Sequence, residues 1–293
     1  MTKYFLIIIL LSFSNSNFAQ DEAKDYGDAI KLIEAWLDAQ KDYEKLPGIT
    51  ASIVSDQDLI WAGAFGMANV EGKVKSDSAT LCSICSISKL FTSVAIMKLY
   101  DEGKLRLDDK IEDLLPWYDL EQQYKESGPI TVRTLMTHSS GLPRENTFSH
   151  WNGPDFNFPT KEEIKANLSN QQTLYPASTY FQYSNLALTL LGYVVEEVSG
   201  ETFEDYVKTN ILSKLGLEDT RSTMPKSLHG SQLAIGYGPL SREGKRKEFN
   251  LFNANGVEAA AGFSSNVVDL GKFAAWQFRL RDSTITEILK PTS

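Results

Sequence analysis

The chain has 293 residues, of which 42% are hydrophobic and 23% charged, a composition typical of a soluble globular protein with one large or two modest domains. Its formal net charge of −9 argues against nucleic acid, and against an anionic membrane surface, as the main partner.

Residues 1–20 have the layout of a secretory signal peptide. Lys3 provides a short positive region, the run from residue 4 to residue 13 is almost wholly apolar, and small and polar residues lead to Ala19 and Gln20. The apolar run is too short for a comfortable bilayer span, and no other segment could span a membrane. We therefore expect an exported protein, periplasmic or secreted, with no transmembrane segment after cleavage; an uncleaved anchor is the alternative.

The first elements after this segment are predicted to be a helix and a β-hairpin. Residues 25–43 carry a helical apolar stripe of Ile30, Ile33 and Leu37, with Trp36 beside it. The β-rich runs 49–55 and 59–65 flank a polar turn and predict the hairpin.

From residue 86 onward the chain is predicted to be mainly helical, with long loops. The first of these helices is expected to bury Leu90, Val94 and Met97, and Ser264 or Ser265 is expected to cap the last clear one. The aromatic segment 144–160 suits either a loop that lines a cleft or a long loop packed on the surface. The expected helices cover residues 86–102, 110–115, 131–138, 160–168, 186–198, 202–215 and 265–278, with one more possible within residues 280–293.

The sequence contains one Ser-x-x-Lys pattern, at Ser86 and Lys89. If a helix begins near Ser86, the two side chains project from the same face, one turn apart. A serine hydroxyl becomes a good nucleophile only when a base takes its proton, and a lysine can do so only while its amine is neutral. A helix start adds a positive partial charge where an oxyanion would develop. The pattern therefore predicts a nucleophile and its base.

Cys82 and Cys85 form a Cys-x-x-Cys pattern just before this motif. A redox role would need a βαβ context, which the sequence lacks, and metal binding would need further ligands, while no histidine lies nearby. We therefore expect two small residues packed beneath the nucleophile turn; their redox state is left open. No metal or other cofactor is expected.

Five segments together resemble the class C β-lactamase and D-alanyl-D-alanine carboxypeptidase family of penicillin-recognising serine hydrolases. The likeness covers roughly residues 47–280 and follows the order of the family. The segments are residues 85–92, 99–105, 130–143, 183–185 and 262–273.

The resemblance implies a role for each matching residue. Ser86 would be acylated, Lys89 would help to remove its proton, and Tyr183 would contact both and pass protons to the leaving group. Asn185 would hold a substrate amide or the Lys89 ammonium. The implied activity is hydrolysis of a β-lactam, a D-alanyl peptide or an ester, three substrates that the sequence does not separate. The oligomeric state is left open.

The implied fold is α+β, of the β-lactamase/transpeptidase type, with an antiparallel sheet flanked by helices and a mostly helical subdomain. Residues 21–293 would form one β-lactamase-related domain, with an α/β part (21–104 and about 259–293) and a helical part (105–258). Family members carry a Lys/His-x-Gly motif on a strand near the C-terminus, whereas no glycine follows Gly271 here. We expect either a C-terminally truncated chain, which lacks the last strands of the sheet, or a degenerate member, with impaired activity in both cases.

The residues argue against two other classes of hydrolase, and one alternative lies outside enzymes. A Ser-His-Asp hydrolase is disfavoured because only His138, His150 and His229 are present and no Gly-x-Ser-x-Gly elbow exists; His138 is interpreted as structural. A metallohydrolase is disfavoured because no paired-histidine spacing occurs. The alternative outside enzymes is a non-catalytic or fragmentary member that binds peptide or peptidoglycan without turnover.

Overall fold

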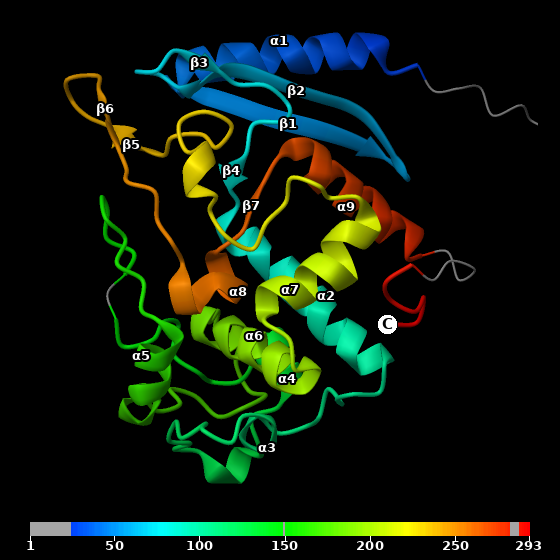
Figure 1. Cartoon of the computed structure of the whole chain (residues 1–293), viewed down its shortest axis with the longest axis vertical. Helices are drawn as coiled ribbons and strands as arrows, with labels where there is room; N and C mark the ends of the chain where they lie inside the picture. The colour runs from blue at the N-terminus through cyan, green and yellow to red at the C-terminus, as the bar shows by residue number, and fades with distance from the viewer. Residues whose placement is uncertain (1–24, 149, 282–286) are drawn as a thin grey trace, which may run out of the picture.

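The computed structural model describes residues 25–148, 150–281 and 287–293, which have an α+β architecture (Figure 1). The expected fold class is therefore confirmed, while the predicted signal peptide lies outside the described residues. The strands are β1 (Gly48–Ser55), β2 (Asp58–Asn69), β3 (Val74–Lys75), β4 (Cys82–Ser83), β5 (Tyr237–Leu240), β6 (Arg246–Glu248) and β7 (Ser264–Ser265). The helices are α1 (Gly27–Tyr43), α2 (Ser88–Asp101), α3 (Ile111–Leu114), α4 (Val132–Met136), α5 (Lys161–Ala166), α6 (Asn185–Ser199), α7 (Phe203–Val207), α8 (Glu258–Ala261) and α9 (Val267–Arg279).

The main sheet of the described residues is antiparallel, in the order β1-β2-β3. The expected hairpin is confirmed, with Ile49 paired to Phe65 and Ser55 to Asp58 across a two-residue turn. In Figure 1, α1 lies above the hairpin and α9 below it, and both helices contact its strands. Trp36, expected beside the apolar stripe of α1, is 59% exposed, because it lies on the solvent side of a helix that covers only one face of the sheet.

The hydrophobic core is centred on α6, which is buried from its first residue to Val195. α2, α4, α7 and α8 all pack against this helix. Gly192 makes the close approach to α8 possible, since a Cβ at this position would lie 2.4 Å from the Cβ of Ala259. The Ser184 hydroxyl caps the start of α6, and Gly200 ends it in a left-handed conformation. The packing of α6 on α2 and α8 brings distant segments to one site.

The helix expected from Ser86 begins two residues later, at Ser88, after a 3₁₀ turn over Cys85–Ile87. Cys85 has a φ of +42°, and the Ser88 hydroxyl donates to its carbonyl at 2.5 Å. Val94 is buried as expected and Met97 is partly buried, but Leu90 is 53% exposed. The prediction for Leu90 was wrong because the fully buried face of α2 runs through Phe91, Ala95 and Leu99.

Two further segments differ from their predicted structure, and a third is described only in part. Ser264 and Ser265 do not cap a helix but form β7, paired with β4, and the cap of α9 is Asn266, whose side chain accepts from the Asp269 N–H at 2.8 Å. Only the start of the expected helix over 202–215 is α-helical; it continues as a π turn and a 3₁₀ turn. Within residues 287–293 there is no helix, and residues 282–286 lie outside the described part of the chain.

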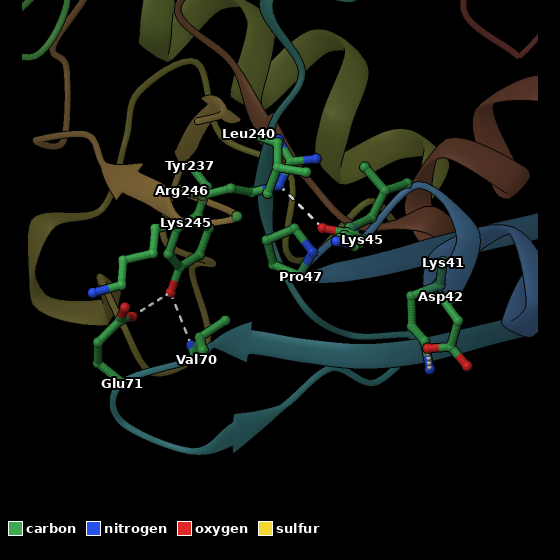
Figure 2. A pocket seen from close by; sticks show the side chains of 12 residues that line it. Lys41, Asp42, Lys45, Pro47, Val70, Glu71, Tyr237, Leu240, Lys245 and Arg246 are labelled. Carbon is green, nitrogen blue, oxygen red and sulfur yellow. Dashed lines mark hydrogen bonds and ion pairs between the residues drawn. The ribbon is translucent and has the colours of Figure 1, made fainter. Parts of the chain in front are cut away.

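The β5–β6 hairpin was not expected from the sequence. Its Arg246 donates to the backbone carbonyls of Glu44 and Lys45, and Tyr237 donates to the Glu71 carboxylate at 2.7 Å. Figure 2 shows the contacts of Arg246 with Lys45 and of Tyr237 with Glu71, beside a hollow of about 500 Å³ between the end of α1, the β2–β3 turn and the hairpin. Half of its lining residues are charged, and none of the predicted site residues lines it. The hairpin thus closes over the sheet edge, away from the predicted nucleophile.

Glu258, the first residue of α8, is expected to make the stability of the fold vary with pH. Burial, together with Glu196 and Glu204, raises the pKa of this carboxyl to about 7, although Lys161 opposes the shift. The unfolded chain ionises Glu258 near pH 4.5, so this residue favours unfolding progressively as pH rises from about 4.5 to 7. We expect Glu258→Gln to raise the free energy of unfolding at pH 8 by about 2 kcal/mol, with little change at pH 4. Urea denaturation at both pH values measures this difference, and an equal effect at both would contradict it.

Candidate active site

Three of the predicted site residues meet at Ser86. The Tyr183 hydroxyl donates to Ser86 Oγ at 2.8 Å, and Lys89 Nζ lies 3.1 Å from the same oxygen. Ser86 stands in the 3₁₀ turn before α2, Lys89 in the first turn of α2, and Tyr183 two residues before α6. Ser86 itself is exposed, so its hydroxyl is open to an incoming molecule. The site thus joins two segments about a hundred residues apart in sequence.

Lys89 is held in surroundings that favour its neutral amine. Only 7% of the residue is exposed, and Nζ donates to the backbone carbonyl of Ala260 in α8 at 2.8 Å. Burial lowers the pKa of Lys89, although Tyr183 and then Glu145 act in the opposite direction. The ammonium lies 4.9 Å from the centre of the Tyr183 ring. The amine that faces Ser86 Oγ therefore loses its proton more readily than a surface lysine does.

The ring of Tyr183 lies close to two side chains that are not among the predicted site residues. The centre of its ring lies 4.6 Å from the centre of the His138 ring and 4.9 Å from the Arg144 guanidinium. His138 Nδ1 accepts the Ser184 N–H at 3.2 Å, and burial, followed by the charge of Lys89, lowers the His138 pKa. The structural interpretation of His138 agrees with this contact to the backbone, which lies one residue after Tyr183.

Asn185 lies in this region but does not contact Ser86 or Lys89 through a hydrogen bond. Its Nδ2 donates to Glu145 Oε1 at 2.6 Å, and its Oδ1 is buried without a hydrogen-bond partner. Glu145 was missed because a carboxylate in a long loop has no sequence pattern of its own. The available signal was its position two residues after the 130–143 motif, whose end packs against the Tyr183 turn.

A largely apolar cavity of about 460 Å³ lies next to the nucleophile turn. Cys85, which precedes Ser86, lines it together with Trp151 and Phe156 from the long aromatic loop. Of the two interpretations of the 144–160 segment, the one in which it lines a cleft therefore holds for these two aromatic residues. Cys82 and Cys85 are free thiols, both partly buried, and burial raises the pKa of Cys82.

Two negative findings apply to the described ranges 25–148, 150–281 and 287–293. No group of three or more histidine, cysteine, aspartate or glutamate side chains is arranged to hold a metal ion there. No helix in that part of the chain combines the length and apolar character that a membrane crossing requires.

Comparison with known proteins identifies relatives that are similar in sequence. The chain is 30% identical over 227 residues to Protein flp of Staphylococcus aureus (strain N315), and 29% identical over 229 residues to Beta-lactamase-like protein 2 of Dictyostelium discoideum. These alignments cover 76% and 73% of this chain but only 44% and 40% of the relatives. The chain thus spans less than half the length of these relatives.

Solved structures also resemble this one. The octameric penicillin-binding protein homologue from Pyrococcus abyssi superposes with a TM-score of 0.77 at 32% identity, over 90% of this chain and 58% of that one. A β-lactamase/D-alanine carboxypeptidase from Yersinia pestis has a TM-score of 0.68 at 23% identity, over 85% of this chain and 69% of that one, and so supports the fold alone.

The family model for Beta-lactamase matches residues 33–290, which include all four predicted site residues. Since this match covers most of the chain, the protein belongs to the beta-lactamase family.

Proposed function

We propose that the protein is a serine hydrolase that works through an acyl-enzyme on Ser86. Lys89, as the neutral amine, accepts the Ser86 proton while Oγ attacks the substrate carbonyl and forms the new C–O bond. Tyr183 then passes its proton to the leaving group as the bond from that group to the carbonyl carbon breaks, and the Lys89 ammonium gives the proton taken from Ser86 to Tyr183. Water hydrolyses the resulting ester, which releases the acid and restores the serine.

The observation that carries this proposal is the double contact on Ser86 Oγ. A lysine on the protein surface would be almost fully protonated at neutral pH, with no lone pair for the serine proton. Here burial lowers the Lys89 pKa, and Lys89 Nζ and the Tyr183 hydroxyl both lie within 3.1 Å of Oγ. A base and a proton carrier around one exposed serine are what acyl transfer requires.

Family membership supports hydrolysis, and the sequence motifs support acylation by a β-lactam, a D-alanyl peptide or an ester, as in class C β-lactamases and D-alanyl-D-alanine carboxypeptidases. Export to the periplasm or the medium is part of the same proposal and rests on the pattern of residues 1–20. That location would bring the protein to cell-wall peptides and to β-lactams.

The proposal is tested by covalent labelling of the folded protein. We expect a fluorescent penicillin or a fluorophosphonate ester to attach one equivalent to the chain, and peptide mass spectrometry to locate the adduct on Ser86. Adducts on other serines, or no adduct on a protein that melts cooperatively, would contradict it and favour a non-catalytic member that binds peptide or peptidoglycan.

A further inference from the structure

The hollow between the end of α1, the β2–β3 turn and the β5–β6 hairpin carries an excess of positive charge (Figure 2). Four of its lining residues are cationic and two are carboxylates, whereas the whole chain has a net charge of −9. Both carboxylates already have partners. Asp42 pairs with Lys41 Nζ at 3.1 Å, and Glu71 accepts the Tyr237 hydroxyl at 2.7 Å.

The other three cations of the hollow have no carboxylate partner within the described part of the chain. Lys45 and Lys245 are exposed, and neither ammonium makes a hydrogen bond or an ion pair there. The half-buried Arg246 donates only to backbone carbonyls, those of Lys45 and Gly238 at 3.0 Å and that of Glu44 at 3.1 Å. These bonds use three of its five N–H groups, so the hairpin holds a fixed cation that keeps two donors for an anion.

Apolar side chains form most of the remaining wall of the hollow. Leu46, Val70 and Leu240 are 37%, 44% and 39% exposed, and they line it together with Pro47 and Tyr237. Single exposed apolar residues are normal on a protein surface, but a concave group of them beside unpaired cations is typical of a ligand site. The volume of about 500 Å³ falls in the range of small-molecule sites.

We propose that this hollow binds a small organic anion with an apolar body, such as an aromatic carboxylate, at a site separate from Ser86. The anionic group contacts Arg246 and Lys45, and the apolar body lies on the wall beside them. Figure 2 shows Glu71 on the opposite side of the hollow from Lys45, so the charge of the ligand avoids this carboxylate. None of the predicted site residues lines the hollow, and the inference therefore does not depend on acyl transfer.

Two matched ligands test the need for a negative charge. 2-Naphthoate and 2-naphthamide share the same aromatic body and nearly the same shape, but only the first is an anion at neutral pH. We expect the full chain to bind 2-naphthoate with a millimolar or lower Kd, about tenfold below that of 2-naphthamide, the effect of one charge-assisted hydrogen bond. Ligand-observed NMR titration measures both constants without any turnover.

Four variants locate the site. Arg246→Gln should raise the Kd for 2-naphthoate about tenfold, and Lys45→Gln about threefold, with little change for 2-naphthamide. Arg246 also holds the hairpin, whereas the Lys45 side chain has no contact to lose, so Lys45→Gln separates binding from folding. Leu240→Asn should weaken both ligands alike, because it alters only the apolar wall. Lys125→Gln, which replaces an exposed lysine outside the hollow, is the matched control and should change neither Kd.

The apolar cavity beside the nucleophile turn is the competing location for the ligand, and Trp151→Ala tests it because Trp151 lines that cavity alone. A preference for the anion that falls in Arg246→Gln and Lys45→Gln, and persists in Lys125→Gln and Trp151→Ala, supports the proposal. No saturable binding of 2-naphthoate, equal Kd values for the two ligands, or an unchanged Kd in Lys45→Gln would overturn it. Loss of binding in Trp151→Ala would place the ligand in the other cavity and overturn it as well.

Discussion

Ser86→Ala is expected to reduce hydrolysis by roughly 10⁶-fold and to abolish covalent labelling, because no other hydroxyl replaces the nucleophile of an acyl-enzyme. The Ser86 side chain is exposed and its hydrogen bonds are to Lys89 and Tyr183. Loss of its hydroxyl therefore leaves no cavity in the core, and the melting temperature should change little. The measurement is the kcat for a chromogenic β-lactam or ester, with labelling followed on a gel.

The matched control is Ser227→Ala, which removes an exposed hydroxyl from the 3₁₀ turn Lys226–Leu228, outside the site. It should retain the activity and labelling of the unaltered protein. Turnover by Ser86→Ala within a factor of ten of the unaltered protein would mean that another group carries the reaction, and the proposed mechanism would have to be abandoned.

Much of this site could be predicted because it depends on short-range patterns. The three-residue spacing of Ser86 and Lys89 places both on one turn, whether that turn is α or 3₁₀. The two side chains therefore lie close together, as the spacing predicts, although α2 begins two residues later than expected. The β1–β2 hairpin could also be predicted from the sequence, because its register follows from two β-rich runs around a tight turn.

The contacts that complete the site could not be predicted because they join segments distant in sequence through groups without a pattern. Lys89 is held by a backbone carbonyl, that of Ala260, and any residue type carries such a group. The pairing of β4 with β7 spans only two residues on each side, too few for an alternating pattern. That pairing places Ser264 and Ser265 in a strand and leaves the cap to Asn266.

Asn185 shows that contacts with distant segments cannot be predicted even for a residue within a motif. The Tyr-x-Asn spacing indicated correctly that residues 183 and 185 belong together, and the Ser184 cap fixes both at the start of α6. The partner of the Asn185 amide depends on a loop 40 residues earlier, whose Glu145 carboxylate reaches it. The motif therefore predicted which residues lie close together, whereas tertiary packing determined which hydrogen bond the Asn185 side chain makes.

Lys89→Met is expected to lower the acylation rate by about 10²–10⁴-fold, the usual contribution of a general base, while the serine stays in place. Methionine fills a similar volume and adds no charge, so the packing of α2 on α8 should persist. Because burial lowers the Lys89 pKa, acylation by the unaltered protein should rise with pH through that pKa, at a lower pH than for an exposed lysine. The charged and titratable groups that affect it are Tyr183, Glu145 and Arg144.

The control is Lys98→Met, on the same helix. Lys98 has a side chain 16% exposed and is paired with Glu102 at 2.7 Å, so it tests the loss of a partly buried lysine away from the nucleophile. We expect it to keep both the rate and the pH profile. In Lys89→Met the remaining acylation should lose its rise with pH, since the group that titrates is gone. A Lys89→Met protein that retained that rise would show that another base accepts the Ser86 proton, and Lys89 would then serve only to hold the turn against α8.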